Sequence, residues 1–347
     1  MYKFLNHDDV ERFRRLVESA GRIALTCHVR PDGDAIGATL GLMHMLRALG
    51  KEAVVVTPDQ PPRALDFLPG FKEISVYTRH EEYCRRILAE SDLIICCDFN
   101  KPSRQDRLAS AVTDSPAKRV LIDHHLDPDD FCEVSFSFPD MSSTCEVAFR
   151  LIAALGLYVD MSLDTATCLL TGMVTDTRNF SVNCKNPDLY EILVKLLEKG
   201  ADKTYIVKKA LDTQSLASLR LQAYAISDKM EIFEKHHVAV TTLDKGELKV
   251  FGYERGDTEG LVNLPLQVRG MVASFFLRED DDCIKVSARS VSDYPVSKVC
   301  ESLFGGGGHL MAAGGEYHGS LADCRRILVE ALPDYDRYLP QRLEKIE

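Results

Sequence analysis

Aspartates and histidines that could bind a divalent cation occur at four places in the first half of the chain. They are His28, Asp32, Asp34, Asp98, Asp123, His124, His125 and Asp176. Carboxylate oxygens combined with imidazole nitrogens, without a thiolate, suit Mn²⁺ and, as the alternative, Mg²⁺. Two such ions about 3.5–4 Å apart, joined by a bridging carboxylate, activate water for attack on phosphorus. The residue types therefore indicate a dinuclear metal centre for phosphoryl hydrolysis.

Three of these four places follow a short apolar segment, and Asp176 follows an apolar helical run over residues 168–174. Residues 23–27 run into His28, residues 93–97 run into Asp98, and residues 120–122 run into Asp123. Short apolar runs rich in β-branched residues and leucine are typical of buried strands in a parallel sheet. Open α/β sheets bind their ligands just beyond the carboxyl ends of such strands. We therefore expect these side chains to meet at one edge of a sheet.

Taken singly, each candidate ligand also has a structural explanation. Asp34 could be the N-cap of a helix over residues 35–49, Asp98 could simply end a strand, and Asp176 could lie in a turn after a helix. One histidine of the His124-His125 pair could cap a helix while the other lies on the surface. The agreement of four separate places within one half of the chain favours the metal centre.

The order of apolar patterns predicts two domains. Strand and helix alternate through the first half, which is typical of parallel βαβ units and predicts a doubly wound α/β domain. Beyond residue 226 the pattern predicts a smaller mixed α/β domain, with strands at 238–243, 272–277 and 284–288, a hairpin turn at 280–282, and helices at 296–303 and 322–332. We place the metal-binding catalytic domain at 1–190, a helical connector at 191–225 and a substrate-binding domain at 226–347.

Composition excludes several classes of protein. The net charge of −11 disfavours binding along a duplex, but a small anionic substrate is compatible with it because bound cations reverse the local field. No apolar run approaches the roughly 18 residues that span a bilayer, and the first nine residues turn acidic where a signal peptide would be apolar, so we expect a cytoplasmic protein without a membrane partner. The eleven cysteines, without a Cys-x-x-Cys pair, are expected to be reduced.

The order and spacing of the candidate ligands resemble the four motifs of the DHH phosphoesterase superfamily. These motifs are His28-x-x-x-Asp32-x-Asp34, Asp98, Asp123-His124-His125 and Asp176. The glycine run from Gly305 to His309, followed by Ala312 to Gly315, resembles the signature of the DHHA1 domain. Together the motifs span nearly the whole chain. Length and layout are most similar to the nano-RNase and 3′-phosphoadenosine-5′-phosphate phosphatase subgroup.

The resemblance implies a role for each candidate ligand. One metal ion would be held by His28, Asp32 and Asp98, and the other by Asp34, Asp98, His124 and Asp176, with Asp98 as the bridge. Asp98, Asp123 and His125 would be the catalytic residues. His125 would then face the substrate phosphate, and Asp123 would orient an imidazole.

The glycine run in the second domain could bind an anion. Glycines without a Cβ can turn their amides toward a phosphate, although the same run could simply be a flexible turn, and no Lys-Ser/Thr follows to make it a Walker loop. The resemblance implies an anion-binding loop that closes over an active site in the cleft between the domains. The substrate-binding candidates are His125, Arg269, Arg289, Ser290, Gly306, Gly307, Gly308 and His309. Arg104 and Ser142-Ser143-Thr144 are secondary candidates, the latter equally explained as a helix cap.

These observations lead to one main functional hypothesis. We expect a Mn²⁺-dependent two-metal phosphohydrolase that degrades short single-stranded oligoribonucleotides from the 3′ end and dephosphorylates 3′-phosphoadenosine-5′-phosphate. Alternatives are a linear dinucleotide phosphodiesterase and a polyphosphate or pyrophosphate hydrolase. A different class is a non-catalytic nucleotide-binding protein, which should have lost some ligands, whereas none is missing here. The oligomeric state is left open.

Overall fold

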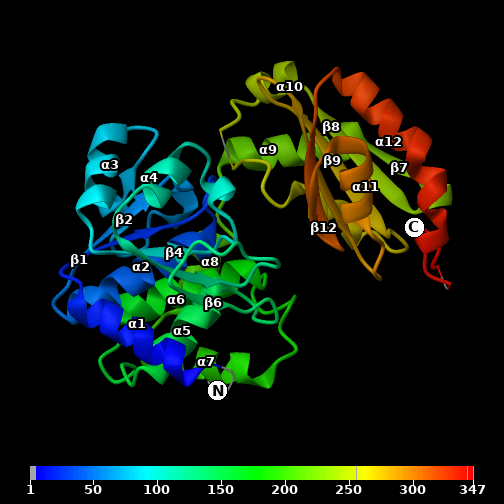
Figure 1. Ribbon diagram of the computed structural model, residues 1–347. Helices are drawn as coiled ribbons and strands as arrows, with labels where there is room; N and C mark the ends of the chain where they lie inside the picture. The colour runs from blue at the N-terminus through cyan, green and yellow to red at the C-terminus, as the bar shows by residue number, and fades with distance from the viewer. Residues whose placement is uncertain (1–4, 255, 342, 347) are drawn as a thin grey trace. The chain divides into compact units, whose positions relative to one another are not determined.

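The computed structural model describes residues 5–254, 256–341 and 343–346, and the chain divides into two compact units. The first unit comprises residues 1–213 and the second residues 214–347. The helices of the predicted connector are divided between them: α7 (Pro187–Glu198) and α8 (Lys203–Ala210) belong to the first unit, and α9 (Leu216–Tyr224) belongs to the second (Figure 1).

The first unit contains a six-stranded parallel sheet with the strand order β3-β2-β1-β4-β5-β6. The strands are β1 (Arg22–Thr26), β2 (Glu52–Thr57), β3 (Ser75–Val76), β4 (Leu93–Cys97), β5 (Lys118–Asp123) and β6 (Val134–Ser137). The chain moves outward from β1 to β3 and then returns to place β4 on the other side of β1. The predicted doubly wound sheet is therefore confirmed, with its switch point between β1 and β4.

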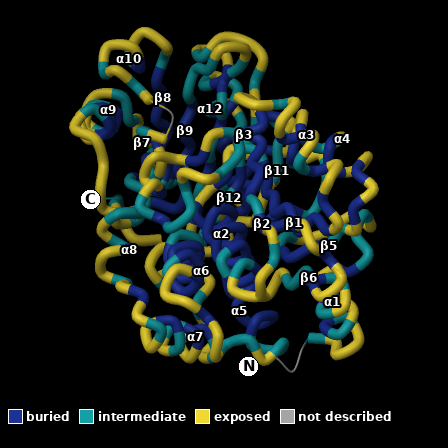
Figure 2. The backbone as a smooth tube through the Cα atoms, turned by 90° about the vertical axis from the view of Figure 1, so that its left-hand side faces the viewer, coloured by how far each residue is buried: buried dark blue, intermediate teal, exposed yellow. Residues whose placement is uncertain are grey.

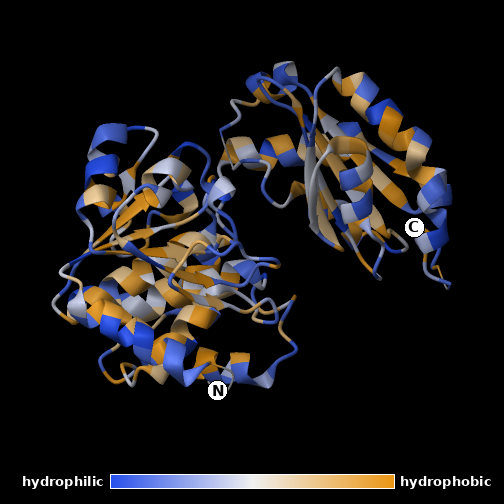
Figure 3. Cartoon of the chain, in the orientation of Figure 1, coloured by the Kyte–Doolittle hydropathy of each residue, from blue (hydrophilic) through white to orange (hydrophobic). Residues whose placement is uncertain are grey.

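Helices cover both faces of this sheet, so its strands are apolar on both sides. All five residues of β4 are buried; Leu93, Ile95 and Cys97 face one core, whereas Ile94 and Cys96 face the other. The first core includes α1 (His7–Ser19), α2 (Gly33–Ala48), α5 (Thr144–Ala154) and α6 (Leu163–Asp176), and the second includes α3 (Glu81–Glu90) and α4 (Ala109–Thr113). Figure 2 shows the buried strands and Figure 3 their apolar character.

Helices α2 and α6 pack closely because glycines lie between them. A Cβ on Gly37 would come 2.5 Å from the carbonyl oxygen of Cys168, and a Cβ on Gly33 would come 2.4 Å from Oγ1 of Thr175. The start of α2 therefore lies beside the end of α6, so the two helices run antiparallel. This packing brings the first residues of α2 next to Asp176, the last residue of α6.

The second unit contains a mixed sheet with the strand order β11-β12-β10-β9-β8-β7. The strands are β7 (Met230–Phe233), β8 (Val238–Leu243), β9 (Ala273–Glu279), β10 (Ile284–Ser290), β11 (Gly307–His309) and β12 (Ala312–Tyr317). Strands β8 and β9 are parallel, and the other neighbours are antiparallel. Helices α11 (Val296–Phe304) and α12 (Leu321–Tyr335) share a core with β8 to β10, and α9 and α10 (Lys245–Val250) belong to a smaller one. The predicted mixed α/β domain and the hairpin turn between β9 and β10 are confirmed.

One expectation about the second unit needs correction. The glycine run was expected to form only a loop, but Gly307–His309 forms β11 and pairs with β12. A Cβ on Gly306 would come 1.9 Å from the Gly314 carbonyl oxygen, and Gly308 has φ +143 with the Ala312 carbonyl oxygen 2.5 Å from the position of a Cβ. Glycine is required at both positions because the β12 backbone lies so close.

All eleven cysteines are free thiols, in agreement with the sequence prediction. Among the described residues, no helix has both the length and the apolar character needed to cross a membrane.

Candidate metal centre

The neighbouring strands β1, β4 and β5 deliver candidate ligands to one edge of the first sheet. His28 follows β1, Asp98 follows β4, and Asp123 is the last residue of β5. Because these three strands are parallel and adjacent, their carboxyl ends lie together. Asp98 has φ 64, a left-handed conformation that aspartate and asparagine adopt more readily than most other residues.

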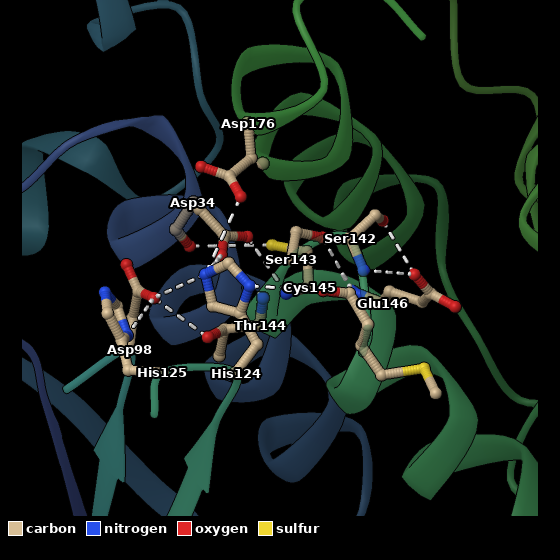
Figure 4. A network of polar contacts seen from close by, with 12 residues as sticks. Asp34, Asp98, His124, His125, Ser142, Ser143, Thr144, Cys145, Glu146 and Asp176 are labelled. Carbon is tan, nitrogen blue, oxygen red and sulfur yellow. Dashed lines mark hydrogen bonds and ion pairs between the residues drawn. The ribbon is translucent and has the colours of Figure 1, made fainter. Parts of the chain in front are cut away.

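Asp98 lies among three imidazoles and is only 2% exposed. Its Oδ2 is 3.3 Å from Nε2 of His28, and its Oδ1 is 3.6 Å from Nε2 of His124. Oδ1 also lies 3.7 Å from Nδ1 of His125. The central position of Asp98 is what a bridging carboxylate would require (Figure 4).

The candidate donors gather into groups small enough to surround an ion. The groups are His28, Asp32 and Asp98; Asp34, His124 and Asp176; and Asp98, His124 and His125. Within each group, one ligand atom from every residue lies within 4.8 Å of the others. The structure thus brings together every residue that the family resemblance implied as a metal ligand.

The two aspartates at the start of α2 have different roles. Asp32 is the N-cap, and its Oδ1 accepts hydrogen bonds from the backbone N–H groups of Asp34 and Ala35 at 3.0 and 3.1 Å. The alternative that Asp34 caps this helix is therefore wrong. The Asp34 carboxylate is instead buried, at 1% exposure, and points toward the start of α5.

The start of α5 holds two of the candidate ligands. The backbone N–H of Thr144 donates to Oδ2 of Asp34 at 2.6 Å, and the N–H of Cys145 donates to its Oδ1 at 2.9 Å. The Thr144 hydroxyl donates to Oδ1 of Asp98 at 2.9 Å. Ser143 is the N-cap of α5, as the sequence suggested, but the contacts of Thr144 with the two carboxylates were not foreseen. No local sequence signal could have shown them, because Thr144 and Asp34 are 110 residues apart.

Three histidines each have one ring nitrogen held by a neighbouring oxygen. Nδ1 of His28 lies 2.7 Å from the Val29 carbonyl oxygen, and Nδ1 of His124 lies 3.3 Å from the Met141 carbonyl oxygen. Their Nε2 atoms consequently face the carboxylates. Nδ1 of His125 lies 2.7 Å from Oδ1 of the fully buried Asp123. Such contacts fix the tautomer and direction of an imidazole.

The buried carboxylates of this cluster have pKa values shifted in different directions. Burial opposes ionisation of Asp98, but the hydrogen bond and charge of His28 outweigh it and hold the pKa of Asp98 well below its usual range. Burial and the charge of Asp98 raise the pKa of Asp34 from 3.8 to about 7, and burial and Asp34 raise the pKa of Asp176 well above its usual range.

The imidazoles respond to the same charges. Burial favours the neutral form of His28 and His124, but the surrounding carboxylates raise the pKa of both from 6.5 to about 9. A cluster that retains protons in order to balance buried negative charge is suited to cations, which can replace those protons. The donor set, with its oxygens and imidazole nitrogens, fits divalent metal ions.

The substrate-binding candidates of the second unit lie near one end of its sheet. Arg289 pairs with Ala312, and Ala312 pairs with His309, so the structure aligns Arg289 and His309 across neighbouring strands. His309 is exposed. Ser290 is buried, and its hydroxyl donates to the Tyr294 carbonyl oxygen. Arg269 is exposed in the segment before β9, near Glu344.

A doubly wound sheet with carboxylates and imidazoles gathered at its switch point places the chain among the metal-dependent phosphoesterases. The model of the DHH family, N-terminal domain, matches residues 22–173, and the model of the DHHA1 domain matches residues 237–333. A relative from Thermus thermophilus, the bifunctional oligoribonuclease and PAP phosphatase NrnA, is 32% identical over 303 residues, which cover 86% of this chain and 85% of the relative. The chain belongs to the DHH family and carries a DHHA1 domain.

Other relatives show how broadly this architecture is used. The cyclic-di-AMP phosphodiesterase GdpP of Geobacillus thermodenitrificans is 28% identical over 93% of this chain, but the chain spans only 49% of that relative. An exopolyphosphatase-related protein from Bacteroides fragilis has a TM-score of 0.94 and 40% identity, covering 97% of this chain and 99% of that one. Thermus thermophilus RecJ in complex with Mn²⁺ has a TM-score of 0.61 at 15% identity, with 100% of this chain and 57% of RecJ covered, and therefore shows the shared fold.

Proposed function

We propose that the protein removes nucleotides from the 3′ end of short oligoribonucleotides and dephosphorylates 3′-phosphoadenosine-5′-phosphate. The observation that carries this proposal is the buried Asp98, which belongs to two of the donor groups and has the position that a two-metal phosphohydrolase would require of a bridging carboxylate. The choice of substrate is supported by the NrnA relative, which aligns over 85% of its own length. Family membership favours an enzyme over the non-catalytic alternative.

Two Mn²⁺ ions are the proposed cofactors. We assign His28, Asp32 and Asp98 to one ion and Asp34, Asp98, His124 and Asp176 to the other. The first set is an observed donor group, and Asp98 lies 3.6 Å from His124 of the observed group Asp34, His124 and Asp176. When bound, such ions neutralise phosphate charge and lower the pKa of water, which makes it a nucleophile near neutral pH.

The protein's own residues position the reacting groups. Carbonyl oxygens hold Nδ1 of His28 and of His124, so their Nε2 atoms are aimed at the centre before any substrate arrives. Asp123 holds Nδ1 of His125, which turns Nε2 of His125 toward the substrate; when the imidazole carries both protons, Nε2 can donate to a phosphate oxygen. Donors fixed in advance need no rearrangement as charge develops on the phosphate.

We further propose that the DHHA1 domain binds the substrate. Arg289 and His309 are aligned on neighbouring strands, and a guanidinium can grip a phosphate through two parallel hydrogen bonds. Arg269, Ser290 and Gly306 to Gly308 are further candidates in the same unit. The net charge of −11 supports short substrates over long ones, because few phosphates could be neutralised along the protein surface.

A second candidate substrate is a linear dinucleotide. Relatives named as cyclic-di-AMP phosphodiesterases, whose similarity extends over 93% of this chain, suggest it, because opening one phosphodiester of a cyclic dinucleotide gives a linear dinucleotide. Polyphosphate is the third candidate, suggested by the exopolyphosphatase-related structure.

One experiment distinguishes these substrates. Purified protein with Mn²⁺ is incubated with RNAs of about 3 to 30 nucleotides, 3′-phosphoadenosine-5′-phosphate, linear dinucleotides, duplex RNA and polyphosphate. We expect the short RNAs and 3′-phosphoadenosine-5′-phosphate to be hydrolysed fastest and duplex hardly at all. The Asp98→Asn variant controls for contaminating nucleases. Hydrolysis of polyphosphate alone, or equal rates per 3′ end on the shortest and longest RNAs, would contradict the proposal.

A further inference from the structure

The segment from Met141 to Glu146 contacts three candidate metal ligands although it contributes none itself. The Met141 carbonyl oxygen lies 3.3 Å from Nδ1 of His124. Three residues further on, Thr144 donates from its backbone to Asp34 and from its hydroxyl to Asp98. The segment therefore determines how side chains from three other parts of the sequence are directed.

Thr144 joins the two halves of the proposed centre. Asp34 is assigned to one ion, and Asp98 is assigned to both, so a single residue restrains ligands of each ion. The Thr144 hydroxyl donates one hydrogen bond to Oδ1 of Asp98 at 2.9 Å. The remaining lone pairs of the Asp98 carboxylate stay available to a metal ion. The amides of Thr144 and Cys145, at the start of the eleven-residue helix α5, hold both oxygens of Asp34. These donors restrict rotation of both carboxylates about their side-chain bonds, and they add to the contact of His28 with Oδ2 of Asp98.

A buried ion pair holds this segment in place. Oε2 of Glu146 accepts hydrogen bonds from the Ser142 backbone at 2.8 Å and from the Ser142 hydroxyl at 2.6 Å. Oε1 of Glu146 accepts from Nε and Nη2 of Arg150 at 2.9 and 2.6 Å, and Nη1 of Arg150 reaches Asp188 in α7 at 3.2 Å. Glu146 and Arg150 are each only 1% exposed. Burying two charges is costly, so such a pair is better explained by the geometry it imposes than by stability.

We propose that Thr144 is a positioning residue for both metal ions, and that the Glu146–Arg150 pair fixes the segment carrying it. This inference rests on the proposed metal centre but not on the proposed substrate. A hydroxyl donor that restrains Asp98 raises metal affinity, because the carboxylate then loses less orientational freedom when a metal ion binds.

The test is Mn²⁺ binding to the purified protein of residues 1–347, measured by isothermal titration calorimetry in the absence of substrate. Thr144→Val removes the hydroxyl and keeps both the β-branched shape and the backbone amide that binds Asp34. We expect Mn²⁺ affinity to fall about 10- to 100-fold, the range typical for losing an outer contact to a metal ligand. Thr144→Ser retains the hydroxyl and should bind Mn²⁺ within about threefold of wild type. Thr144→Ala tests the same loss if the valine variant fails to fold.

Thr39→Val is the matched control. Thr39 is also fully buried in the first unit, but its hydroxyl donates only to helix carbonyls of Ala35 and Ile36 among the contacts of the described residues. Its Mn²⁺ affinity should stay at the wild-type level. Wild-type Mn²⁺ affinity and stoichiometry in folded Thr144→Val or Thr144→Ala would overturn the inference, as would an equal loss in Thr39→Val. Absence of Mn²⁺ binding by the wild-type protein would instead show that the proposed centre itself is wrong.

Discussion

Asp98 combines burial, contact with imidazoles and a left-handed backbone at φ 64. A non-glycine residue in this conformation costs free energy and persists only where the surrounding structure holds it in place. Asparagine tolerates the conformation about as well as aspartate, whereas alanine would add backbone strain to the loss of the carboxylate. Asparagine is therefore the better substitution for separating charge from backbone strain.

Asp98→Asn should deplete both proposed metal ions, because each loses a charged ligand. We expect Mn²⁺ affinity and turnover to fall by at least the roughly 10- to 100-fold caused by losing an outer contact to a ligand. Metal content per chain and kcat on a short RNA are the measurements. Asp114→Asn, the same change at an exposed aspartate, should leave both at wild-type values. A fully metal-loaded, active Asp98→Asn protein would disprove the bridging role.

Metal binding should release protons near neutral pH. His28 and His124 have a pKa of about 9 in the metal-free protein and are protonated at pH 7.5, but only the neutral imidazole binds a metal. Raising the pH removes these protons, so Mn²⁺ affinity should increase from pH 6.5 toward pH 9. Calorimetric titrations in two buffers with different ionisation enthalpies measure the protons released. Identical heats in the two buffers would contradict this prediction.

His309→Ala should affect substrate use but not metal content, because His309 lies in β11 of the second unit, whereas every assigned ligand belongs to the first. Loss of one charge-assisted hydrogen bond to phosphate should lower kcat/KM by a factor that corresponds to about 1–3 kcal/mol of activation free energy. Metal analysis and steady-state kinetics on short RNA provide the comparison, with His124→Ala as the metal-depleted reference. Loss of metal from His309→Ala, or unchanged kcat/KM on every substrate, would exclude the assigned role.

At the scale of secondary structure, the antiparallel packing of α2 against α6 determines where Asp34 and Asp176 lie. A Cβ on Gly172 in α6 would come 2.2 Å from Sγ of Cys145 and 2.7 Å from Oδ1 of Asp34. The glycine thus allows three elements, α2, α5 and α6, to meet beside the candidate centre. Its position in the helix is unfavourable by propensity alone, since alanine is the better helix former.

Gly172→Ala should therefore destabilise the protein, although alanine has a higher helix propensity than glycine. Overpacking typically costs about 1–3 kcal/mol of unfolding free energy, and displacement of Asp34 should also weaken Mn²⁺ binding. Denaturant unfolding and Mn²⁺ titration measure the two effects. Gly21→Ala is a suitable control, because a Cβ there meets only Oδ2 of Asp92 at 3.5 Å. A Gly172→Ala protein as stable as wild type would show that the helices can move apart without cost.

Sequence patterns predicted the strands and ligands that are locally encoded. Strands β1, β4 and β5 appear as apolar runs, and Asp98 was recognisable because it follows one of them directly. Strand β3, with only two residues, was not predicted because it carries too little pattern to detect. The contacts of Thr144 with Asp34 and Asp98 were also missed, because they arise from packing between segments that are 110 and 46 residues apart.

At the scale of the whole molecule, the proposed metal binding and the proposed substrate binding by the DHHA1 domain involve different units. The first unit has its own cores and holds every candidate metal ligand, whereas Arg269, Arg289, Ser290 and His309 belong to the second unit. Metal binding is therefore expected to stabilise one part of the chain directly.

Hydrogen exchange with and without Mn²⁺ tests this expectation. A ligand at 100 times its Kd stabilises the state that binds it by about 2.7 kcal/mol. We expect slower exchange in β1, β4, β5 and the start of α2, and unchanged exchange in α11 and α12. Mg²⁺ at the same concentration gives a comparison between the two candidate ions. Equal protection of both units would contradict a centre confined to the first.

The donors around Asp98 come from segments that extend from His28 to Asp176, and β1 and β4 pair residues as distant as Ile23 and Leu93. An unfolded or partly folded chain consequently offers no preformed place for the ions, and the slow step of joining distant parallel strands must come first. Interactions that form after the transition state leave the folding rate unchanged and slow unfolding. The ions should therefore bind after the transition state of folding. They should lower the unfolding rate of the first unit and leave its folding rate unchanged.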